Sequence, residues 1–212
     1  MKQTLLLLVV WLHTGCSGLR SAELPRMSAE LQLRPGATVA DLGAGDGEVT
    51  AALAEIVGAT GRVFASEIEA DKRAKLEGRA RNVAVVVASD TATGLARGCC
   101  DAIVMRAVYH HLTRPVVILA DILGALKPGG RFLVIDFEPA WFLPDIDGVP
   151  ADREGHGVAR ETVIREARGA GLEHVKTIDA WPAMWPLGPY AVVLRKPLAP
   201  AALVRDPTEG RR

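Results

Sequence analysis

An acidic residue followed by three glycines at alternate positions is the first pattern in this chain that could bind a ligand. The run Asp41-Leu-Gly-Ala-Gly-Asp-Gly47 lies between a short apolar stretch and a stretch with apolar residues at helical spacing, the setting that gives glycine loops meaning. Gly43 and Gly45 permit backbone angles and a close ligand approach that a Cβ would block. The following helix offers its N-terminal NH groups to an anion. Alone the loop is a weak signal, because many strand-to-helix turns are glycine-rich only to pack tightly.

A second acidic residue narrows the choice of ligand. Glu67 lies 20 residues after Gly47, at the end of the second predicted strand, where it could accept hydrogen bonds from ribose hydroxyls. Dinucleotide-binding folds share this spacing, but their G-x-G-x-x-G fingerprint would put its third glycine at Glu48, whose carboxylate would repel a pyrophosphate. S-adenosylmethionine carries no phosphate, and the chain lacks a second domain to hold a hydride acceptor. The sequence therefore predicts S-adenosylmethionine as the cofactor.

Side chains that could act on a second substrate follow the fourth and fifth predicted strands, at the edge where ligands gather in open α/β sheets. Tyr109 and His110 follow the fourth strand, and His110 and His111 cannot point the same way if that strand continues. We expect one histidine to point inward and the other to be structural. Asp136 ends the fifth strand and either faces the ligand or pins the loop after it. His156, in that loop, is a candidate base or lid residue, or a surface histidine.

Arg106 stands in an otherwise apolar predicted strand, where an unpaired charge would be costly. Two interpretations are open. Either Arg106 lies at the open end of the strand and faces the ligand, or it pairs with Glu67, Asp41 or Asp136.

The elements that must position these residues alternate along the chain. Stretches typical of strands cover residues 38–41, 62–66, 83–88, 102–108, 131–137, 172–178 and 190–195, and helical stretches cover 48–57, 69–81, 115–126 and 160–170. The run at 83–88 is rich in β-branched residues, which predicts a strand buried on both faces. Residues 127–130 predict a turn, and 138–157 a long loop, which inside a compact domain is more often functional than idle. Alternating strands and helices predict a mostly parallel sheet in an α/β domain.

Composition excludes some classes of function. The chain has 212 residues, of which 49% are hydrophobic and 24% charged, and Lys plus Arg balance Asp plus Glu at 25 each. A net charge of zero argues against sequence-independent binding of nucleic acid, although a local basic patch stays open. The three cysteines form no CxxC pair, so neither a disulfide framework nor a metal site is expected. The tail at 197–212, rich in Pro, Arg and Ala, is expected to be disordered.

Residues 1–16 are interpreted as a signal-like segment, followed by a short N-terminal segment at 17–32. The apolar run from Leu5 to Leu12 is shorter than the roughly 20 residues that span a bilayer as a helix, and has the length and flanks of a secretory signal. Gly15-Cys16 resembles a bacterial lipoprotein signal, with Cys16 as the lipidation site, although His13 departs from that pattern. The alternatives are a helix packed on the domain or a wrongly assigned start codon. We expect membrane attachment or export, with the cytoplasm as the alternative because S-adenosylmethionine is made there.

From about residue 33 to 196 the chain resembles the class I S-adenosylmethionine-dependent methyltransferases of the small-molecule type. LRPGATVADLGAGDG is similar to the first motif of that family, DAIVMRAVYHHL to its fourth-strand motif, and LKPGGRFLVIDF to its turn and fifth strand. The resemblance implies one Rossmann-like doubly wound domain of about seven strands, mostly parallel with an antiparallel last strand.

The same resemblance implies roles for individual residues, matched motif by motif. The glycine loop would line the methionine part of the cofactor, through Asp41, Gly43, Ala44, Gly45 and Gly47. Glu67 would bind the ribose, Ile68 would pack on the adenine, and Asp90, with Thr91 beside it, would bond the adenine amino group. Arg106 and Ala107 would border the cofactor.

A narrower resemblance connects the chain to a bacterial subgroup, many of whose members begin with lipoprotein-like signals. Tyr109-His-His111, Glu154-Gly-His156 and Ala170-Gly-Leu172 carry it. The chain departs from that subgroup in its shorter segment before the first strand, a segment that normally helps to cover the cofactor and substrate.

The predicted reaction is an in-line transfer of the sulfonium methyl group to a small-molecule or lipid-like acceptor, for which the protein must mainly align the reactants and exclude water. If the acceptor must lose a proton, His110, His156, Tyr109 or Asp136 could accept it. The main alternative is a non-catalytic, membrane-anchored protein of the same fold. A nucleotide-dependent oxidoreductase is disfavoured by Glu48 and the single domain.

Overall fold

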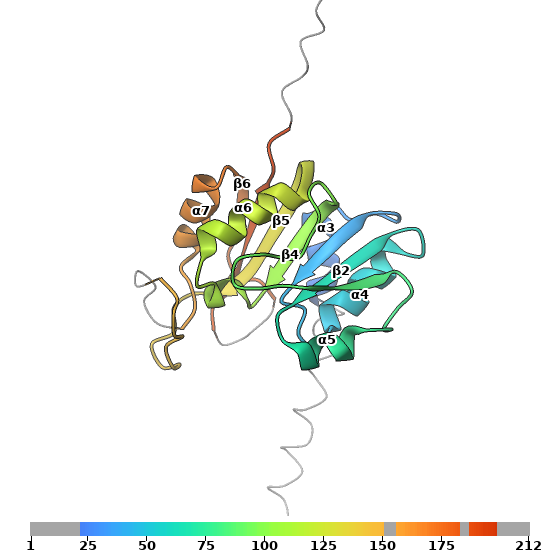
Figure 1. The fold of residues 1–212 in the computed structure, drawn as a ribbon. Coiled ribbons are helices and arrows are strands. Elements are labelled where there is room, and N and C mark those ends of the chain that lie inside the picture. The colour runs from blue at the N-terminus through green and yellow to red at the C-terminus, as the bar shows by residue number, and fades with distance from the viewer. Residues whose placement is uncertain (1–21, 151–155, 183–186, 199–212) are drawn as a thin grey trace, which may run out of the picture.

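The computed structural model describes residues 22–150, 156–182 and 187–198. They form a seven-stranded sheet in the order β3-β2-β1-β4-β5-β7-β6, in which β7 is antiparallel to both of its neighbours and the other pairs are parallel (Figure 1). The strands are β1 (Thr38–Leu42), β2 (Arg62–Glu67), β3 (Val83–Val87), β4 (Cys100–Arg106), β5 (Leu126–Phe137), β6 (Glu173–Ile178) and β7 (Pro189–Arg195). This confirms the predicted α/β fold of about seven strands, including the antiparallel last strand.

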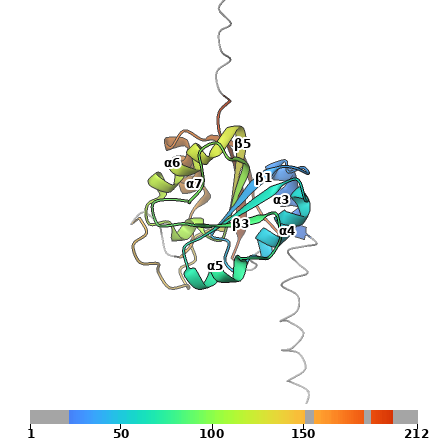
Figure 2. The same cartoon turned by 45° about the vertical axis from the view of Figure 1, so that its right-hand side comes forward.

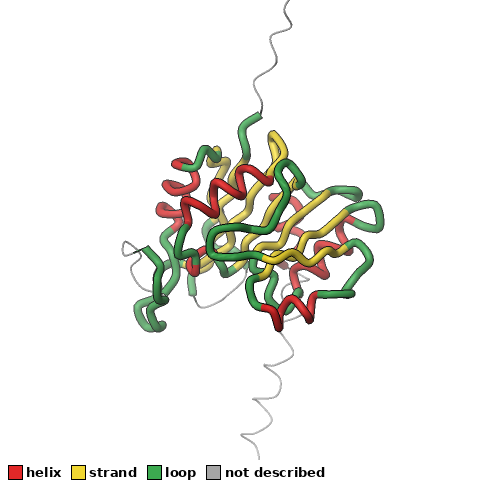
Figure 3. Tube along the Cα trace, viewed as in Figure 1, coloured by secondary structure: helices red, strands yellow, loops and turns green. Residues whose placement is uncertain are grey.

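Helices cover both faces of the sheet (Figures 2 and 3). One face carries α3 (Leu24–Leu31), α4 (Glu48–Val57) and α5 (Ala70–Leu76), and the other carries α6 (Pro115–Ala125) and α7 (Arg160–Gly169). A short 3-10 helix, η3 (Tyr109–His111), follows β4. The domain is therefore doubly wound, with its ligand-binding edge at the carboxyl ends of the parallel strands.

The central strands bury side chains on both faces, which explains their continuous apolar sequences. In β4, Ile103 and Met105 join the core under α6 and α7, whereas Ala102 and Val104 join the core under α3 and α4. Successive side chains of a strand point to opposite faces, so each of the two layers needs every second residue to be apolar.

The prediction that residues 83–88 form a strand buried on both faces is wrong about burial. β3 pairs only with β2, lies at the edge of the sheet, and leaves Val87 67% exposed. A run of β-branched residues specifies an extended backbone, but it does not specify the place of the strand in the sheet.

Two helices differ from the sequence-based expectation. α5 ends at Leu76, earlier than the expected helix at 69–81, because Glu77 is extended and Gly78 has a φ of +72°. α3 was not expected, although Leu24, Met27 and Leu31 are buried at helical spacing. Because these three side chains pack under β4 and β5, α3 shares the core of the domain.

The loop after β5 is held by backbone pairing. Ala140 N donates to His156 O at 2.7 Å, and Val158 N donates to Phe137 O at 3.0 Å. Trp141, in the same loop, is 89% exposed. The predicted turn at 127–130 lies inside β5, where the register jumps between the pairs Cys100–Leu126 and Ala102–Arg131.

Several expectations lie outside the described residues: the signal-like segment at 1–16 with Cys16, and all of the tail after residue 198. Within the described residues, no helix has both the length and the apolar character needed to cross a membrane.

Candidate active site

The glycine loop joins β1 to α4 at the carboxyl edge of the sheet. Gly43 N and Ala44 N both donate to Ser66 O, at 2.8 and 3.1 Å, which ties the loop to the end of β2. Gly43 has a φ of +70°, and a Cβ there would lie 2.6 Å from Val108 Cγ2. Glycine is therefore required at this position both by the backbone conformation and by the contact with the segment after β4.

A polar pocket opens over this loop. Asp41 lies in its wall, almost fully buried, and accepts a hydrogen bond from Thr50 Oγ1 at 2.6 Å. Burial raises the pKa of Asp41 to about 6, although the hydrogen bond from Thr50 and the charge of Arg106 act in the opposite direction. The lining residues are Asp41, Gly43, Ala44, Gly45, Asp46, Glu48, Val49 and Arg106.

Arg106 faces this pocket and is also paired. In the described part of the chain its ion pair is with Glu23, at 2.9 Å from Nε to Oε1. The interpretation that Arg106 faces the ligand side is thus supported by the pocket, whereas the partner in the ion pair differs from Glu67, Asp41 and Asp136, which the other interpretation named. Glu23 is 1% exposed, and its Oε1 also accepts a hydrogen bond from Trp181 Nε1 at 2.8 Å. Nothing local in the sequence indicates Glu23, since 83 positions separate it from Arg106.

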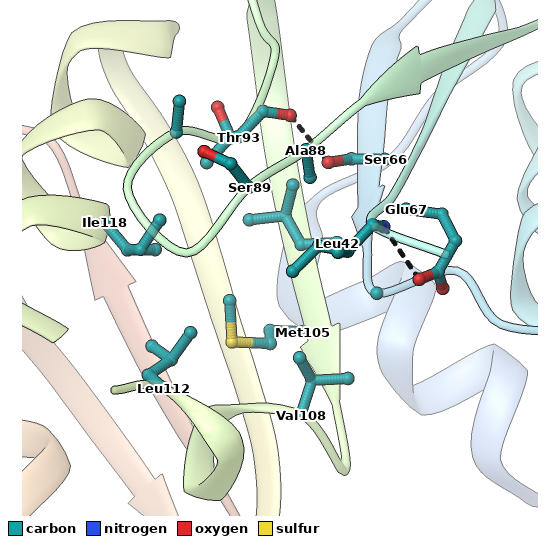
Figure 4. A pocket seen from close by; sticks show the side chains of 13 residues that line it. Leu42, Ser66, Glu67, Ala88, Ser89, Thr93, Met105, Val108, Leu112 and Ile118 are labelled. Carbon is teal, nitrogen blue, oxygen red and sulfur yellow. Dashed lines mark hydrogen bonds between the residues drawn. The ribbon is translucent and has the colours of Figure 1, made fainter. Parts of the chain in front are cut away.

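A second, apolar pocket shares Gly43 with the polar pocket, and Figure 4 shows the side chains that line it. Its lining comes from β1, the end of β2, β4, α6, the two residues that flank η3 (Val108 and Leu112) and the connection from β3 to β4. That connection is held by hydrogen bonds from Ser66 Oγ to Thr93 O and from Thr93 N to Asp121 Oδ2, at 2.6 and 2.7 Å. The lining residues are Leu42, Gly43, Ser66, Glu67, Ile68, Ala88, Ser89, Ala92, Thr93, Met105, Val108, Leu112 and Ile118.

Glu67 lines the apolar pocket and is hydrogen-bonded to Gly45, which lines the polar pocket. Its Oε2 accepts from Gly45 N at 2.8 Å, and its Oε1 accepts from Ile68 N and Glu69 N at 2.8 and 3.1 Å. A carboxylate offers about four acceptor positions, so these backbone donors fix its orientation and leave acceptor capacity for a ligand hydroxyl.

Of the three residues expected to contact the adenine, only one lines the apolar pocket. Ile68 lines the apolar pocket, whereas Asp90 and Thr91 do not. Asp90 is exposed and lies 3.8 Å from Arg114, and Thr91 contacts Ser89. Both positions lie between pocket residues 89 and 92, so their role toward adenine stays a prediction.

Ala107 follows β4 with a φ of +54°, an unusual conformation for a residue with a Cβ. Its NH donates to Ile135 O at 2.8 Å, which continues the β4–β5 ladder for one more residue. Gly47, at the other end of the glycine loop, has a φ of +78°, and a Cβ there would meet Leu76 Cδ2 at 2.5 Å.

Tyr109 and His110 both turn inward, but to different partners. The Tyr109 hydroxyl donates to Glu166 Oε2 on α7 at 2.6 Å, inside the core. His110 contacts Asp136 twice, through its backbone N at 3.1 Å and through Nδ1 at 2.7 Å. Asp136 is fully buried and also accepts from Phe137 N, so in this structure it holds η3 against the end of β5.

Three histidines meet beside Asp136. The rings of His110 and His111 have centroids 4.2 Å apart, and that of His156 lies 5.0 and 5.8 Å from them. The expectation that neighbouring His110 and His111 point apart assumed a continuing strand; β4 ends at Arg106, and the tight turn of η3 brings both rings to one side. Partial burial, followed by the charges of His110 and His156, lowers the pKa of His111.

Comparison with known proteins finds similarity in the central region of the chain. The family model described as "Methyltransferase domain" matches residues 40–134. The ubiquinone/menaquinone biosynthesis C-methyltransferase UbiE of Klebsiella pneumoniae is 36% identical over 111 residues, which are 50% of this chain and 44% of that protein. UbiE of Erwinia tasmaniensis is 34% identical over 118 residues, covering 53% of this chain and 47% of that protein. The matched region thus spans less than half the length of these relatives.

Solved structures share the fold at low sequence identity. A SAM-dependent methyltransferase from Aquifex aeolicus is 21% identical with a TM-score of 0.70, over 85% of this chain and 93% of that one. An S-adenosylmethionine-dependent methyltransferase from Mesorhizobium loti is 17% identical with a TM-score of 0.68, over 84% and 99%. The [4+2]-cyclase SpnF is 15% identical with a TM-score of 0.67, over 83% and 81%. The fold by itself therefore does not define the reaction.

Proposed function

We propose that this chain, which carries a class I S-adenosylmethionine-dependent methyltransferase domain, transfers the methyl group of that cofactor to a small-molecule or lipid-like acceptor. One observation carries the proposal. The polar and apolar pockets share Gly43, and Glu67 of the apolar pocket accepts a hydrogen bond from Gly45 of the polar pocket. S-adenosylmethionine has the same order of groups: a charged methionine end, a ribose and an adenine.

Each part of this composite site suits one part of the cofactor. The carboxylate of Asp41 and the guanidinium of Arg106 offer opposite charges to an ammonium and a carboxylate group in the polar pocket. Glu67 is oriented by three backbone donors toward a ribose. Leu42, Met105 and Val108 provide an apolar surface for a purine. The bound cofactor supplies a methyl group already activated by its sulfonium, so the protein has to position the acceptor and exclude water.

The segment around η3 supports an acceptor site beside the apolar pocket. Val108 and Leu112 line the apolar pocket, and His110 lies between them in sequence, next to the loop that carries His156. In that loop Trp141 and Phe142 expose large apolar surfaces, 89% and 59%, which suit a lipid-like molecule. Because relatives are named for ubiquinone and menaquinone biosynthesis, a quinone precursor is the first acceptor class to test.

Calorimetric titration with S-adenosylmethionine and S-adenosylhomocysteine tests the cofactor site. We expect saturable binding of both, and binding weakened by at least about tenfold in Glu67→Gln, because the amide NH₂ would face a backbone donor. Glu69→Gln is the matched control, since Glu69 is an exposed neighbour paired with Lys72. Absence of binding at millimolar ligand would overturn the proposal. If the cofactor binds but transfers no labelled methyl group to extracted lipids or metabolites, the proposal fails in favour of a non-catalytic role.

We further propose that residues 1–16 direct export and that Cys16 carries a lipid. The support is the apolar run followed by Gly15-Cys16. Mass spectrometry of the mature N-terminus tests it: a lipid-modified Cys16 at the terminus is expected, and an intact chain that starts at Met1 would contradict it.

A further inference from the structure

We propose that His110, His111 and His156 together bind one divalent transition-metal ion of the zinc type. One ligand nitrogen of each of the three residues lies within 4.8 Å of the others. A tetrahedral zinc site with Zn–N bonds of about 2.0–2.1 Å separates its nitrogens by about 3.4 Å. Small side-chain rotations would close that difference. The inference goes beyond methyl transfer, and it does not depend on cofactor binding.

Two of the histidines have hydrogen-bond partners of the kind that metal-binding histidines have. His110 Nδ1 contacts Asp136 Oδ1 at 2.7 Å, and His156 Nδ1 donates to Pro144 O at 2.8 Å. A carboxylate or carbonyl acceptor on Nδ1 fixes the tautomer and leaves the lone pair of Nε2 available to a metal. Metal-binding histidines characteristically have such partners.

The backbone holds the three residues from two separate segments. His110 and His111 are fixed by η3, which is attached to β5 through Asp136. His156 is fixed by the bridge to Ala140 and by Gly157, whose φ is +117° and where a Cβ would lie 2.7 Å from Glu138 O. The positions of the three histidines are thus set by the backbones of two separate segments, η3 and the loop after β5.

Three protein nitrogens leave one position of a tetrahedral ion open, the pattern of catalytic and not of structural zinc sites. His111 is exposed, so the open position is accessible from solvent. A water molecule or an oxygen, nitrogen or sulfur atom of a ligand could occupy it. That this ligand is the methyl acceptor, whose deprotonated form the ion would favour, rests on the proposed function; metal binding itself does not.

Titration of the full-length protein with Zn²⁺ and Co²⁺ tests the site. The protein is prepared without a histidine tag and is stripped with a chelator. We expect about one equivalent to bind, and affinity to fall by at least about tenfold in His111→Gln and in His156→Gln. These two residues are less buried than His110, so their substitution tests the site without leaving a cavity in the core. His174→Gln is the matched control, because His174 lies on β6 and contacts Thr177.

Thermal unfolding and circular dichroism of each variant show that it is folded before its affinity is compared. Absence of saturable binding at micromolar metal, or binding that is unchanged in the His111→Gln/His156→Gln double variant, would overturn the proposal. A cobalt–thiolate charge-transfer band would also overturn it, because it would assign the ion to cysteine ligands in place of the three histidines. Loss of S-adenosylmethionine binding with metal binding retained would refute only the proposed function.

Discussion

Glu23 and Arg106 form an ion pair across 83 positions of sequence, with Arg106 Nε 2.9 Å from Glu23 Oε1. The pair joins the segment before α3 to the end of β4, and Trp181 Nε1 bonds the same Glu23 oxygen. It connects the packing of three distant segments with the wall of the polar pocket, where Arg106 lies.

Glu23→Gln is expected to lower the free energy of unfolding by about 2 kcal/mol, because removal of one partner of a buried pair leaves the other uncompensated. The value is below that of a fully buried pair since Arg106 is 26% exposed. Urea denaturation measures it. The exposed Glu77→Gln, expected to change stability by less than about 0.5 kcal/mol, is the control; equal effects in the two variants would contradict the prediction.

Gly43→Ala is expected to abolish cofactor binding and to destabilise the fold. The added methyl group would meet Val108 at 2.6 Å in a backbone conformation with a φ of +70°. Gly78→Ala separates the two causes, because Gly78 has a φ of +72° and open space around its Cβ position. Gly78→Ala is expected to lower the free energy of unfolding by about 1–2 kcal/mol through backbone strain alone, and to retain the cofactor affinity. Calorimetric titration measures the cofactor affinity of both variants. Similar affinities would contradict the prediction, because they would show that the contact with Val108 does not affect cofactor binding.

The ionisation of Asp41 predicts a pH dependence of stability. Because burial raises its pKa from 3.8 to about 6, the folded protein holds this proton at pH values where the unfolded chain has released it. The contribution of Asp41 to stability therefore falls as pH rises from about 4 to about 6. The free energy of unfolding of the Asp41→Asn variant, relative to that of the native chain at the same pH, is therefore expected to rise by up to about 3 kcal/mol across that window. Denaturation at pH 4 and pH 7 checks this, and a difference that is independent of pH would contradict it.

Tyr109→Phe tests whether the Tyr109 hydroxyl is structural or catalytic. Its bond to Glu166 Oε2 at 2.6 Å places the hydroxyl inside the core between η3 and α7. We expect the variant to lose about 1–2 kcal/mol of stability, since the hydrogen bond is to a charged group, and methyl transfer to fall by less than tenfold. Denaturant unfolding measures the stability of the variant, and the labelled-methyl assay measures its turnover. A loss of turnover above a hundredfold with unchanged stability would assign the hydroxyl to catalysis.

The sequence alone determined the order of strands and helices and the glycine loop, because both depend on local backbone physics. Alternating and continuous apolar runs specify which stretches are extended or helical, and Gly43 and Gly47 mark positive φ angles within a few residues. Glu67 could be placed beside the loop because both follow parallel strands that end at the same edge of the sheet.

Only the tertiary structure decided which distant side chains meet. The edge position of β3 depends on which strands pair, and its composition does not contain that information. The Glu23–Arg106 pair and the meeting of His156 with His110 and His111 depend on how α3 and the loop after β5 fold back on the sheet. These contacts span long stretches of chain, and their geometry follows from packing, which no local pattern of residues records.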